Sequence, residues 1–133
     1  MDIYCFIDPE GASVSVRMEM SKALMAGGDF KIFYRETTKA IESWKLSGDF
    51  KNPDERILRT KRQDLNKSKL AWNILTCSTD PDIYTGFINI KVFQGPDECK
   101  MTYPAKQKIE NIPPCKVKEM QSMNGSLTFF IKK

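Results

Sequence analysis

The chain has 133 residues and no histidine, so any chemistry it does depends on cysteine, carboxylate and cationic side chains. The cysteines are Cys5, Cys77, Cys99 and Cys115, and no two of them form a C-x-x-C pair. Because a structural zinc site needs such pairs or histidines, we predict no metal centre. Residues 1–8 show no secretion signal, which favours reduced thiols packed as small apolar side chains, with a disulfide as the less favoured alternative.

The carboxylates offer no catalytic arrangement. Histidine is the commonest general base and the usual partner of a nucleophilic serine or cysteine, and the chain has none. Six acids lie in turn-like or solvated stretches: Asp8, Glu10, Asp54, Glu55, Asp80 and Asp82. The stretch 26–29 lacks the later glycine and the Lys-Ser/Thr pair of a phosphate-binding loop, and it predicts a turn. We therefore expect a protein that is not an enzyme and that uses no cofactor and no small-molecule substrate.

Positive charge is concentrated between residues 51 and 69, where cations outnumber the acids Asp54, Glu55 and Asp64. The segment is polar and weakly periodic, so we predict an exposed loop. Clustered cations attract anionic lipid headgroups or nucleic-acid phosphate, although a net charge of only +4 also fits ordinary solubility. The segment has no aromatic side chain, which argues against a stacking platform for single-stranded nucleic acid. The predicted membrane- or nucleoprotein-binding residues are Lys51, Arg56, Arg59, Lys61, Arg62, Lys67 and Lys69.

The amino-terminal residues are more apolar than a frayed chain end should be. We predict that they make the protein associate with copies of itself, and an edge strand of its own sheet is an equally good interpretation. The predicted self-association residues are Ile3, Tyr4, Phe6 and Ile7. Apolar runs elsewhere are far shorter than the roughly 20 residues of a membrane-spanning helix, so any membrane contact is expected to be peripheral.

Several stretches have the patterns of strands. Residues 13–20 and 83–93 alternate apolar and polar side chains with a period of two. Residues 70–77 are nearly all apolar, which predicts an interior strand covered on both faces, and a shorter strand is expected at 99–103. The dipeptide Asn124-Gly125 favours a type I′ turn, so the chain is expected to end in a hairpin.

One segment has the period of a helix, because its apolar residues recur at steps of three and four. These residues are Phe30, Phe33, Thr37, Ile41 and Trp44. We therefore predict an α+β fold: a single domain with an antiparallel or mixed twisted sheet of about five to six strands and one main helix packed on it. The predicted divisions are a short apolar segment at 1–12 and a globular domain at 13–133 that contains the basic loop 51–69.

The order of these segments carries a resemblance to a known family. It consists of the alternating strand 14–20, the stretch from Tyr34 to Trp44, the apolar stretch 70–75, Ile112-Pro113, and the closing stretch 124–131. This order resembles the matrix proteins of rhabdoviruses, whose tyrosine-to-tryptophan helix and central strand have similar sequences. The family usually has a basic amino-terminal arm, whereas the first cationic side chain of this chain is Arg17.

The resemblance implies a structural virion protein that binds anionic membrane surfaces and ribonucleoprotein and self-associates to drive assembly, without catalysis. The expected partners are copies of itself, viral ribonucleoprotein or RNA, and an anionic lipid surface. The expected location is the virion and the host cytoplasm at the inner membrane face, with entry into the nucleus as a further option. The alternative is a small RNA-binding accessory protein without a membrane role, which would bind naked RNA with a steep salt dependence.

Overall fold

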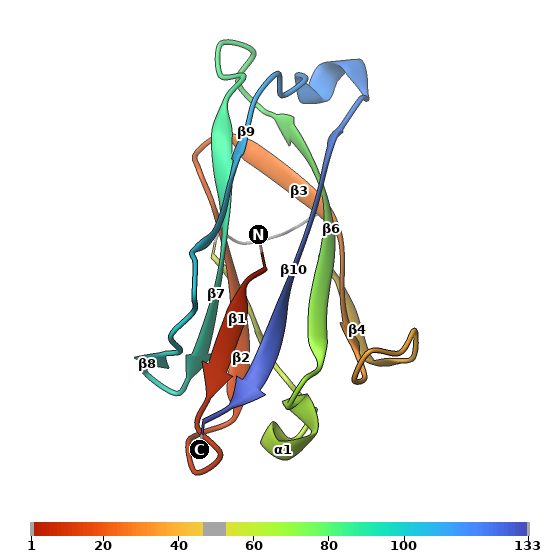
Figure 1. The fold of residues 1–133 in the computed structure, drawn as a ribbon. Helices are drawn as coiled ribbons and strands as arrows, with labels where there is room; N and C mark the ends of the chain where they lie inside the picture. Colours follow the sequence, from red (N-terminus) through yellow and green to blue (C-terminus); the bar gives the residue numbers. More distant parts are fainter. Residues whose placement is uncertain (1, 47–52, 133) are drawn as a thin grey trace.

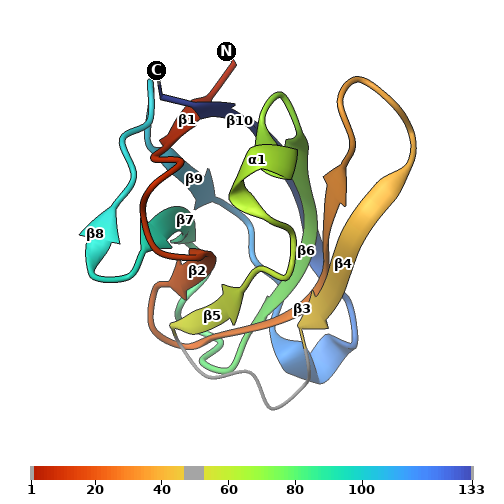
Figure 2. The same ribbon diagram turned by 90° about the horizontal axis from the view of Figure 1, so that it is seen from below.

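The computed structural model describes residues 2–46 and 53–132, which form a sandwich of two β-sheets (Figure 1, Figure 2). Sheet A has the strand order β1-β10-β6-β3-β4. Sheet B has the order β5-β2-β7-β8, and β9 also pairs with β7. The elements are β1 (Tyr4–Ile7), β2 (Val14–Met20), β3 (Leu24–Phe33), β4 (Ala40–Leu46), β5 (Asp54–Ile57), α1 (Arg62–Leu65), β6 (Lys69–Ser78), β7 (Gly86–Gln94), β8 (Asp97–Glu98), β9 (Ala105–Ile109), the 3₁₀ turn η1 (Cys115–Val117) and β10 (Gln121–Ile131).

The core lies between the two sheets. Because side chains alternate along a strand, each sheet presents one apolar face to the other. Sheet A contributes Phe30, Ile32, Leu70, Ile74, Leu127 and Phe129, all of them buried. Sheet B contributes Val14, Val16, Met18, Ile88, Ile90 and Val92, also buried. Burial of these side chains supplies most of the stabilisation, at roughly 25 cal/mol per Å² of apolar surface.

The predicted α+β fold with one main helix is wrong. Strands account for 57% of the structure and helical residues for 6%. The segment expected to be a helix forms the antiparallel hairpin of β3 and β4. Within residues 2–46 and 53–132, no helix has the length and apolar character needed to cross a membrane.

The hairpin wins over the helix because the same apolar residues also fit a period of two. Phe30 and Ile32 are buried on one face of β3, whereas Phe33, which belongs to the expected helical stripe, lies on the opposite face. Between the strands, Arg35 and Glu36 have φ angles of 23° and 56°, in the left-handed region that a helix interior excludes. The turn therefore ends one strand and starts the next.

The predicted hairpin at Asn124-Gly125 is also wrong, because β10 is one continuous strand that pairs antiparallel with β6. Gly125 lies opposite Trp72, and a Cβ on it would be 2.4 Å from the Trp72 ring. The glycine therefore makes room for the indole and does not form a turn. The strands predicted at 13–20, 70–77 and 83–93 are confirmed as β2, β6 and β7. The expectation that the strand at 70–77 is covered on both faces is wrong, because Asn73 on the outer face of β6 is exposed. The strand expected at 99–103 is reduced to one bridge between Cys5 and Met101.

Two of the cysteines form a disulfide, so the expectation of four reduced thiols is wrong. The bond joins Cys77 and Cys115, whose Cα atoms are 4.9 Å apart. Cys77 lies near the end of β6 and Cys115 begins η1, so the bond holds η1 against one end of sheet A. Cys5 and Cys99 are free and buried.

The amino-terminal stretch forms β1, an edge strand of sheet A that runs parallel to β10. Cys5 and Ile7 are fully buried, and Ile3 packs partly buried against the core. Phe6 is half-buried and Tyr4 is 36% exposed. These residues thus form part of the protein's own sheet, as the alternative interpretation expected, and self-association through them stays a prediction.

The outer edge of β1 already has backbone partners. The Phe6 amide donates to the Lys100 carbonyl at 3.0 Å, and the Thr102 amide donates to the Tyr4 carbonyl at 3.0 Å. An edge strand with satisfied backbone groups offers little to a pairing strand from another chain. This side of the sandwich is therefore closed by the segment that follows β8.

Candidate anion-binding groove

The predicted basic loop contains β5 and α1, and its cations point to several different places. Lys51 lies outside the described residues. Arg56 pairs with Glu42 at 3.1 Å, and Arg62 Nε donates to the Pro9 carbonyl at 3.2 Å. These two arginines have partners within the fold.

The remaining four cations of the segment lie in two separate regions of the surface. Lys67 and Lys69 line a hollow beside β1 and β10. Arg59 and Lys61 line a hollow at the α1 end of the sandwich, and they also line a neighbouring one together with Arg62. The structure therefore divides the predicted surface into two smaller sites.

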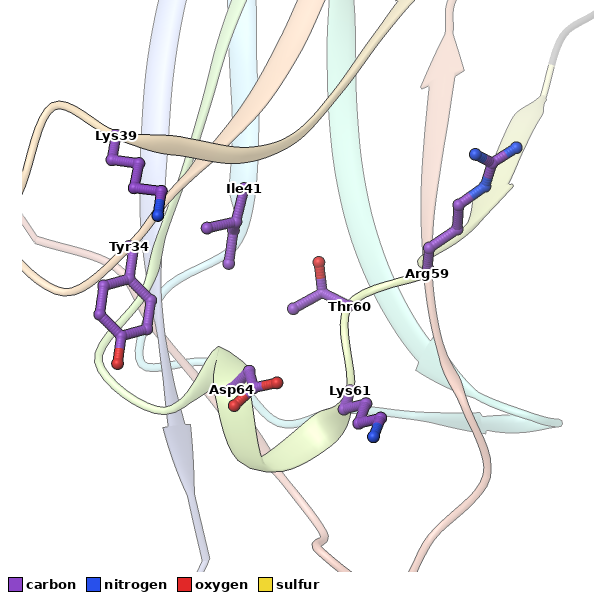
Figure 3. A pocket seen from close by; sticks show the side chains of 7 residues that line it. All are labelled: Tyr34, Lys39, Ile41, Arg59, Thr60, Lys61 and Asp64. Atoms are coloured by element: carbon purple, nitrogen blue, oxygen red, sulfur yellow. The ribbon is translucent and has the colours of Figure 1, made fainter.

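The hollow at the α1 end is an open groove of about 470 Å³ (Figure 3). One wall comes from the turn between β3 and β4, and the other comes from the segment that joins β5 to α1. The lining residues are Tyr34, Lys39, Ile41, Arg59, Thr60, Lys61 and Asp64. In Figure 3, Ile41 and Lys39 point into the space between the walls, whereas Arg59 and Lys61 extend outward from the rim.

The turn between β3 and β4 holds Tyr34 and Lys39 together. The Tyr34 amide donates to the Lys39 carbonyl at 2.9 Å, and the amide and hydroxyl of Thr37 both donate to the Tyr34 carbonyl. The Arg35 guanidinium lies 5.0 Å from the centre of the Tyr34 ring, and Arg35 Nε donates to the Asn66 carbonyl at 3.3 Å. Because the turn is fastened both to itself and to the end of α1, the Tyr34 ring has a fixed position in the groove.

A β-bulge places Ile41 in the groove. Across the hairpin Ile32 pairs with Glu42 and Phe33 pairs with Ala40, so Ile41 has no strand partner. An extra residue of this kind bends the strand and redirects its side chain. Ile41 becomes the half-buried apolar part of the groove, and the neighbouring Glu42 is buried, with an exposed fraction of 8%.

Glu42 holds the opposite wall. Its Oε1 accepts hydrogen bonds from the Thr60 hydroxyl at 2.7 Å, the Thr60 amide at 2.9 Å and the Arg59 amide at 3.0 Å. Its Oε2 accepts from Arg56 Nη2 at 3.1 Å and Nε at 3.3 Å. Since β4 belongs to sheet A and β5 to sheet B, this one carboxylate joins the edges of both sheets. It uses the backbone of Arg59 and leaves that guanidinium free.

These contacts keep Glu42 ionised. Burial by itself raises the pKa of a carboxyl group. The hydrogen bonds from the Thr60 hydroxyl, from the amides of Arg59 and Thr60, and from Arg56 together outweigh this effect, so the pKa of Glu42 lies below its ordinary value of 4.5. The Glu42 carboxylate is therefore a structural anion, fully occupied by its donors.

The free charge at the groove is positive. Lys39, Arg59 and Lys61 are exposed, and none of them makes an ion pair with a residue in the ranges 2–46 and 53–132. Asp64 is the acid among the lining residues, and it is exposed too. Unpaired cations beside an aromatic ring and an apolar side chain suit an anionic group attached to a less polar body.

Sequence reasoning found Arg59 and Lys61 but missed the rest of the groove. It assigned the stretch from Tyr34 to Ile41 to a helix, which removed these residues from any site with the basic segment. The available signal was the polar run 35–39 between two apolar stretches, which is typical of a hairpin loop. Nothing in the spacing indicated that Glu42 would reach β5.

Among the residues that the structure describes, no group of three or more histidine, cysteine, aspartate or glutamate side chains is placed to hold a metal ion. Comparison with protein-family models, with curated proteins and with solved structures finds no match. The interpretation of the groove therefore depends on its own residues.

Proposed function

We propose that the protein is a non-enzymatic binding module whose groove binds a compact anionic group, such as a phosphate, sulfate or carboxylate, attached to a small apolar or ring-shaped body. The observation that carries this proposal is a set of exposed cations around a groove that also contains Tyr34 and Ile41. These cations, Lys39, Arg59 and Lys61, form no ion pair with any residue that the structure describes. The cations attract the anion, and the ring and the apolar side chain contact the body that bears it.

The walls of the groove are in place before a ligand binds. Glu42 fixes the backbone of Arg59 and Thr60, and the hydrogen-bonded turn fixes Tyr34. Binding then requires only that the side chains of Arg59 and Lys61 rotate inward from the rim. A site that is largely preorganised loses little affinity to the ordering of its own residues.

A concave site favours one compact anionic group over a broad membrane surface. Membrane surfaces attract many cations lying on one exposed plane. Arg56 and Arg62 have partners inside the fold, and Lys67 and Lys69 lie at another hollow. A lipid headgroup and a soluble phosphorylated or sulfated molecule share the chemistry of the groove, so the experiment has to separate these two sources.

Calorimetric titration with inorganic phosphate and with phenyl phosphate tests the groove, and vesicles with anionic headgroups provide the lipid arm. We expect phenyl phosphate to bind more tightly than phosphate, because its ring contacts Tyr34 and Ile41. The double variant Arg59→Gln/Lys61→Gln should weaken binding by about tenfold or more, since hydrogen bonds to charged groups contribute about 1.5–3 kcal/mol each. Lys106→Gln/Lys108→Gln is the matched control, because it removes two exposed charges from β9 in sheet B.

The two sources give different results. A soluble organic phosphate that binds, with no pelleting on anionic vesicles, assigns the groove to a soluble ligand. Pelleting that is lost in the Arg59→Gln/Lys61→Gln variant assigns it to a headgroup. Equal affinity of this variant and Lys106→Gln/Lys108→Gln in every arm would contradict the proposal.

The role of a viral matrix protein stays a prediction. The stretch from Tyr34 to Trp44, which carries much of the resemblance, is a hairpin and not the helix of that family. The groove supports only the binding of an anion. The assembly role, the expected partners and the location in the virion and host cytoplasm also stay predictions. The RNA-binding alternative predicts that short RNA displaces phenyl phosphate from the groove.

A further inference from the structure

The outer face of sheet A carries a second group of cations, which form no ion pair with the part of the chain that the structure describes. Its outward side chains form rows across the strands, because paired residues lie side by side. One row contains Tyr4, Thr128, Lys69 and Phe33. The next contains Ser126, Ala71, Lys31 and Ser43, and a third contains Asn124, Asn73, Asp29 and Lys45. The face is thus made mainly of lysines and small polar side chains.

Three of the lysines form a diagonal line. Lys69, Lys31 and Lys45 lie on β6, β3 and β4, each shifted by one row from the one before. Diagonal neighbours on one face of a sheet are about 7–8 Å apart. All three lysines are exposed. Repeated positive charges along one line match a ligand with repeated negative charges.

The outer face of sheet B shows that this arrangement is not the general pattern of the molecule. There Arg17 pairs with Glu55 at 3.2 Å, and Lys91 pairs with Glu19 at 3.5 Å. Lys106 lies over an aromatic ring, 4.3 Å from its centre. Two cations of sheet B are therefore paired with acids on the same face. By contrast, the three diagonal lysines of sheet A form no ion pair within the described parts of the chain.

One end of the lysine line opens into a hollow of about 440 Å³ between β1, β10 and β6. Lys67 and Lys69 line it together with the hydroxyls of Ser126 and Thr128. The Tyr4 ring stands edge-on to Phe130, with centroids 5.2 Å apart at an interplanar angle of 76°. Asp2 and Glu36 are its acids. The hollow offers an aromatic side wall, hydroxyls and cations in one place.

We infer that the outer face of sheet A binds an extended acidic polysaccharide. The carboxylate or sulfate groups of the chain pair with Lys69, Lys31 and Lys45, and one sugar ring sits in the hollow beside Tyr4. The hydroxyl and amide side chains that separate the lysines donate to and accept from the sugar hydroxyls. These are Ser43, Asn73, Asn124, Ser126 and Thr128.

Three observations favour a polysaccharide over single-stranded nucleic acid. Nucleic-acid platforms stack successive bases on a series of exposed aromatic rings, whereas on this face Tyr4 is exposed and Phe33 is half-buried. The Cys77–Cys115 disulfide is typical of oxidising compartments outside the cytosol, where acidic polysaccharides occur. A hydroxyl-rich face also suits sugars better than bases.

Calorimetric titration of the full chain with a heparin oligosaccharide, an oligogalacturonate, a neutral cello-oligosaccharide and a single-stranded oligonucleotide of matched charge tests this inference. We expect both acidic oligosaccharides to bind, more tightly than the oligonucleotide, and the neutral one not to bind. The variant Lys31→Gln/Lys69→Gln should weaken binding of the acidic oligosaccharides by about fivefold or more. Lys106→Gln/Lys108→Gln again controls for net charge, because it also removes two positive charges, and thermal melting of each variant checks that the fold is intact.

The outcomes decide between the ligands. An oligonucleotide that binds as tightly as the acidic oligosaccharides would overturn the inference, as would equal binding of the neutral one. An effect of Lys31→Gln/Lys69→Gln no larger than that of Lys106→Gln/Lys108→Gln would show that only net charge matters, and it would overturn the inference. The inference does not rest on the groove, because the Arg59→Gln/Lys61→Gln variant should bind acidic oligosaccharides like the wild type.

Discussion

The edges of the two sheets are joined differently on the two sides of the sandwich. On the β1 side, backbone hydrogen bonds join β1 to the segment after β8, and the free thiols of Cys5 and Cys99 are buried. On the side of β4 and β5, the join depends on the carboxylate of Glu42, which reaches the amides of Arg59 and Thr60. One side uses the regular pairing of strands, and the other uses contacts of side chains, chiefly those of Glu42.

This difference explains where the groove lies. Strand-like pairing uses backbone donors and acceptors in sequence and fixes the spacing of the two segments. A side chain that bridges two strands, as Glu42 does, holds them apart by its own length. The space beside Glu42 is therefore open, and the exposed cations Lys39 and Lys61 flank it. In this fold the candidate site lies where regular sheet pairing stops.

Removing the Glu42 carboxylate should lower the free energy of unfolding more than any other change that we propose. Glu42→Ala leaves the Arg56 guanidinium and the amides of Arg59 and Thr60 without their acceptor, and breaking a buried ion pair in this way costs about 4 kcal/mol. Urea unfolding measures the loss. The control is Glu55→Ala, which removes a half-exposed partner of Arg17 and should cost less than about 0.5 kcal/mol. Equal effects would mean that Glu42 is no more important than a surface acid.

Removing the disulfide should lower the free energy of unfolding somewhat less. It should not act selectively on the β1 side or on the side of β4 and β5. Cys77 and Cys115 are separated by 38 residues, and a bond that closes such a loop stabilises a fold by about 3 kcal/mol, mainly by restricting the unfolded chain. We expect Cys77→Ser/Cys115→Ser to lower the urea midpoint while phenyl phosphate binding is unchanged. If the variant loses phenyl phosphate binding but keeps its urea midpoint, the two ends of the sandwich are coupled.

The sequence predicted the strands better than their arrangement. Alternation identified β2 and β7, and an unbroken apolar run identified β6, because these patterns depend only on which face is buried. The segment from Phe30 to Trp44 fits two periods, and only the packing against β6 selects the shorter one. Asn124-Gly125 was misread because the Trp72 indole, which requires the glycine, comes from a distant part of the chain.

The sequence predicted the candidate site less well than it predicted the strands of the fold. Clustered charge indicated Arg59 and Lys61, but it also included Arg56, whose charge is used internally. Which cations stay free depends on where Glu42 lies, and a β-bulge decides that. A bulge of one residue leaves no clear mark in composition or spacing.

Low pH should weaken the side of the sandwich that Glu42 joins, because it protonates this carboxylate. Since the pKa of Glu42 is lowered in the folded state, its contribution to stability is present above the ordinary value of 4.5 and is lost as the pH falls through the folded value. We expect the free energy of unfolding to fall in this acid range, and to fall less in Glu42→Gln. Burial raises the pKa of Asp54, so its contribution has the opposite sign. Comparing the two proteins over the same pH series removes that background.

The smallest effects should come from one threonine on each side. Thr60→Val removes a hydroxyl that donates to Glu42 at 2.7 Å in a partly buried site, and it should cost about 1–1.5 kcal/mol. Thr102→Val removes a hydroxyl that accepts from the Tyr4 amide at 3.0 Å. Thr102 is exposed, and water can replace this acceptor, so the cost should be below about 0.5 kcal/mol.

The same substitution on both sides makes this pair a direct test of how each side is closed. Urea unfolding of the two variants under one set of conditions gives the difference. A larger effect at Thr102 than at Thr60 would mean that side chains, and not backbone pairing, hold the β1 side. It would also mean that Glu42 keeps its other donors well enough to make the Thr60 hydroxyl dispensable.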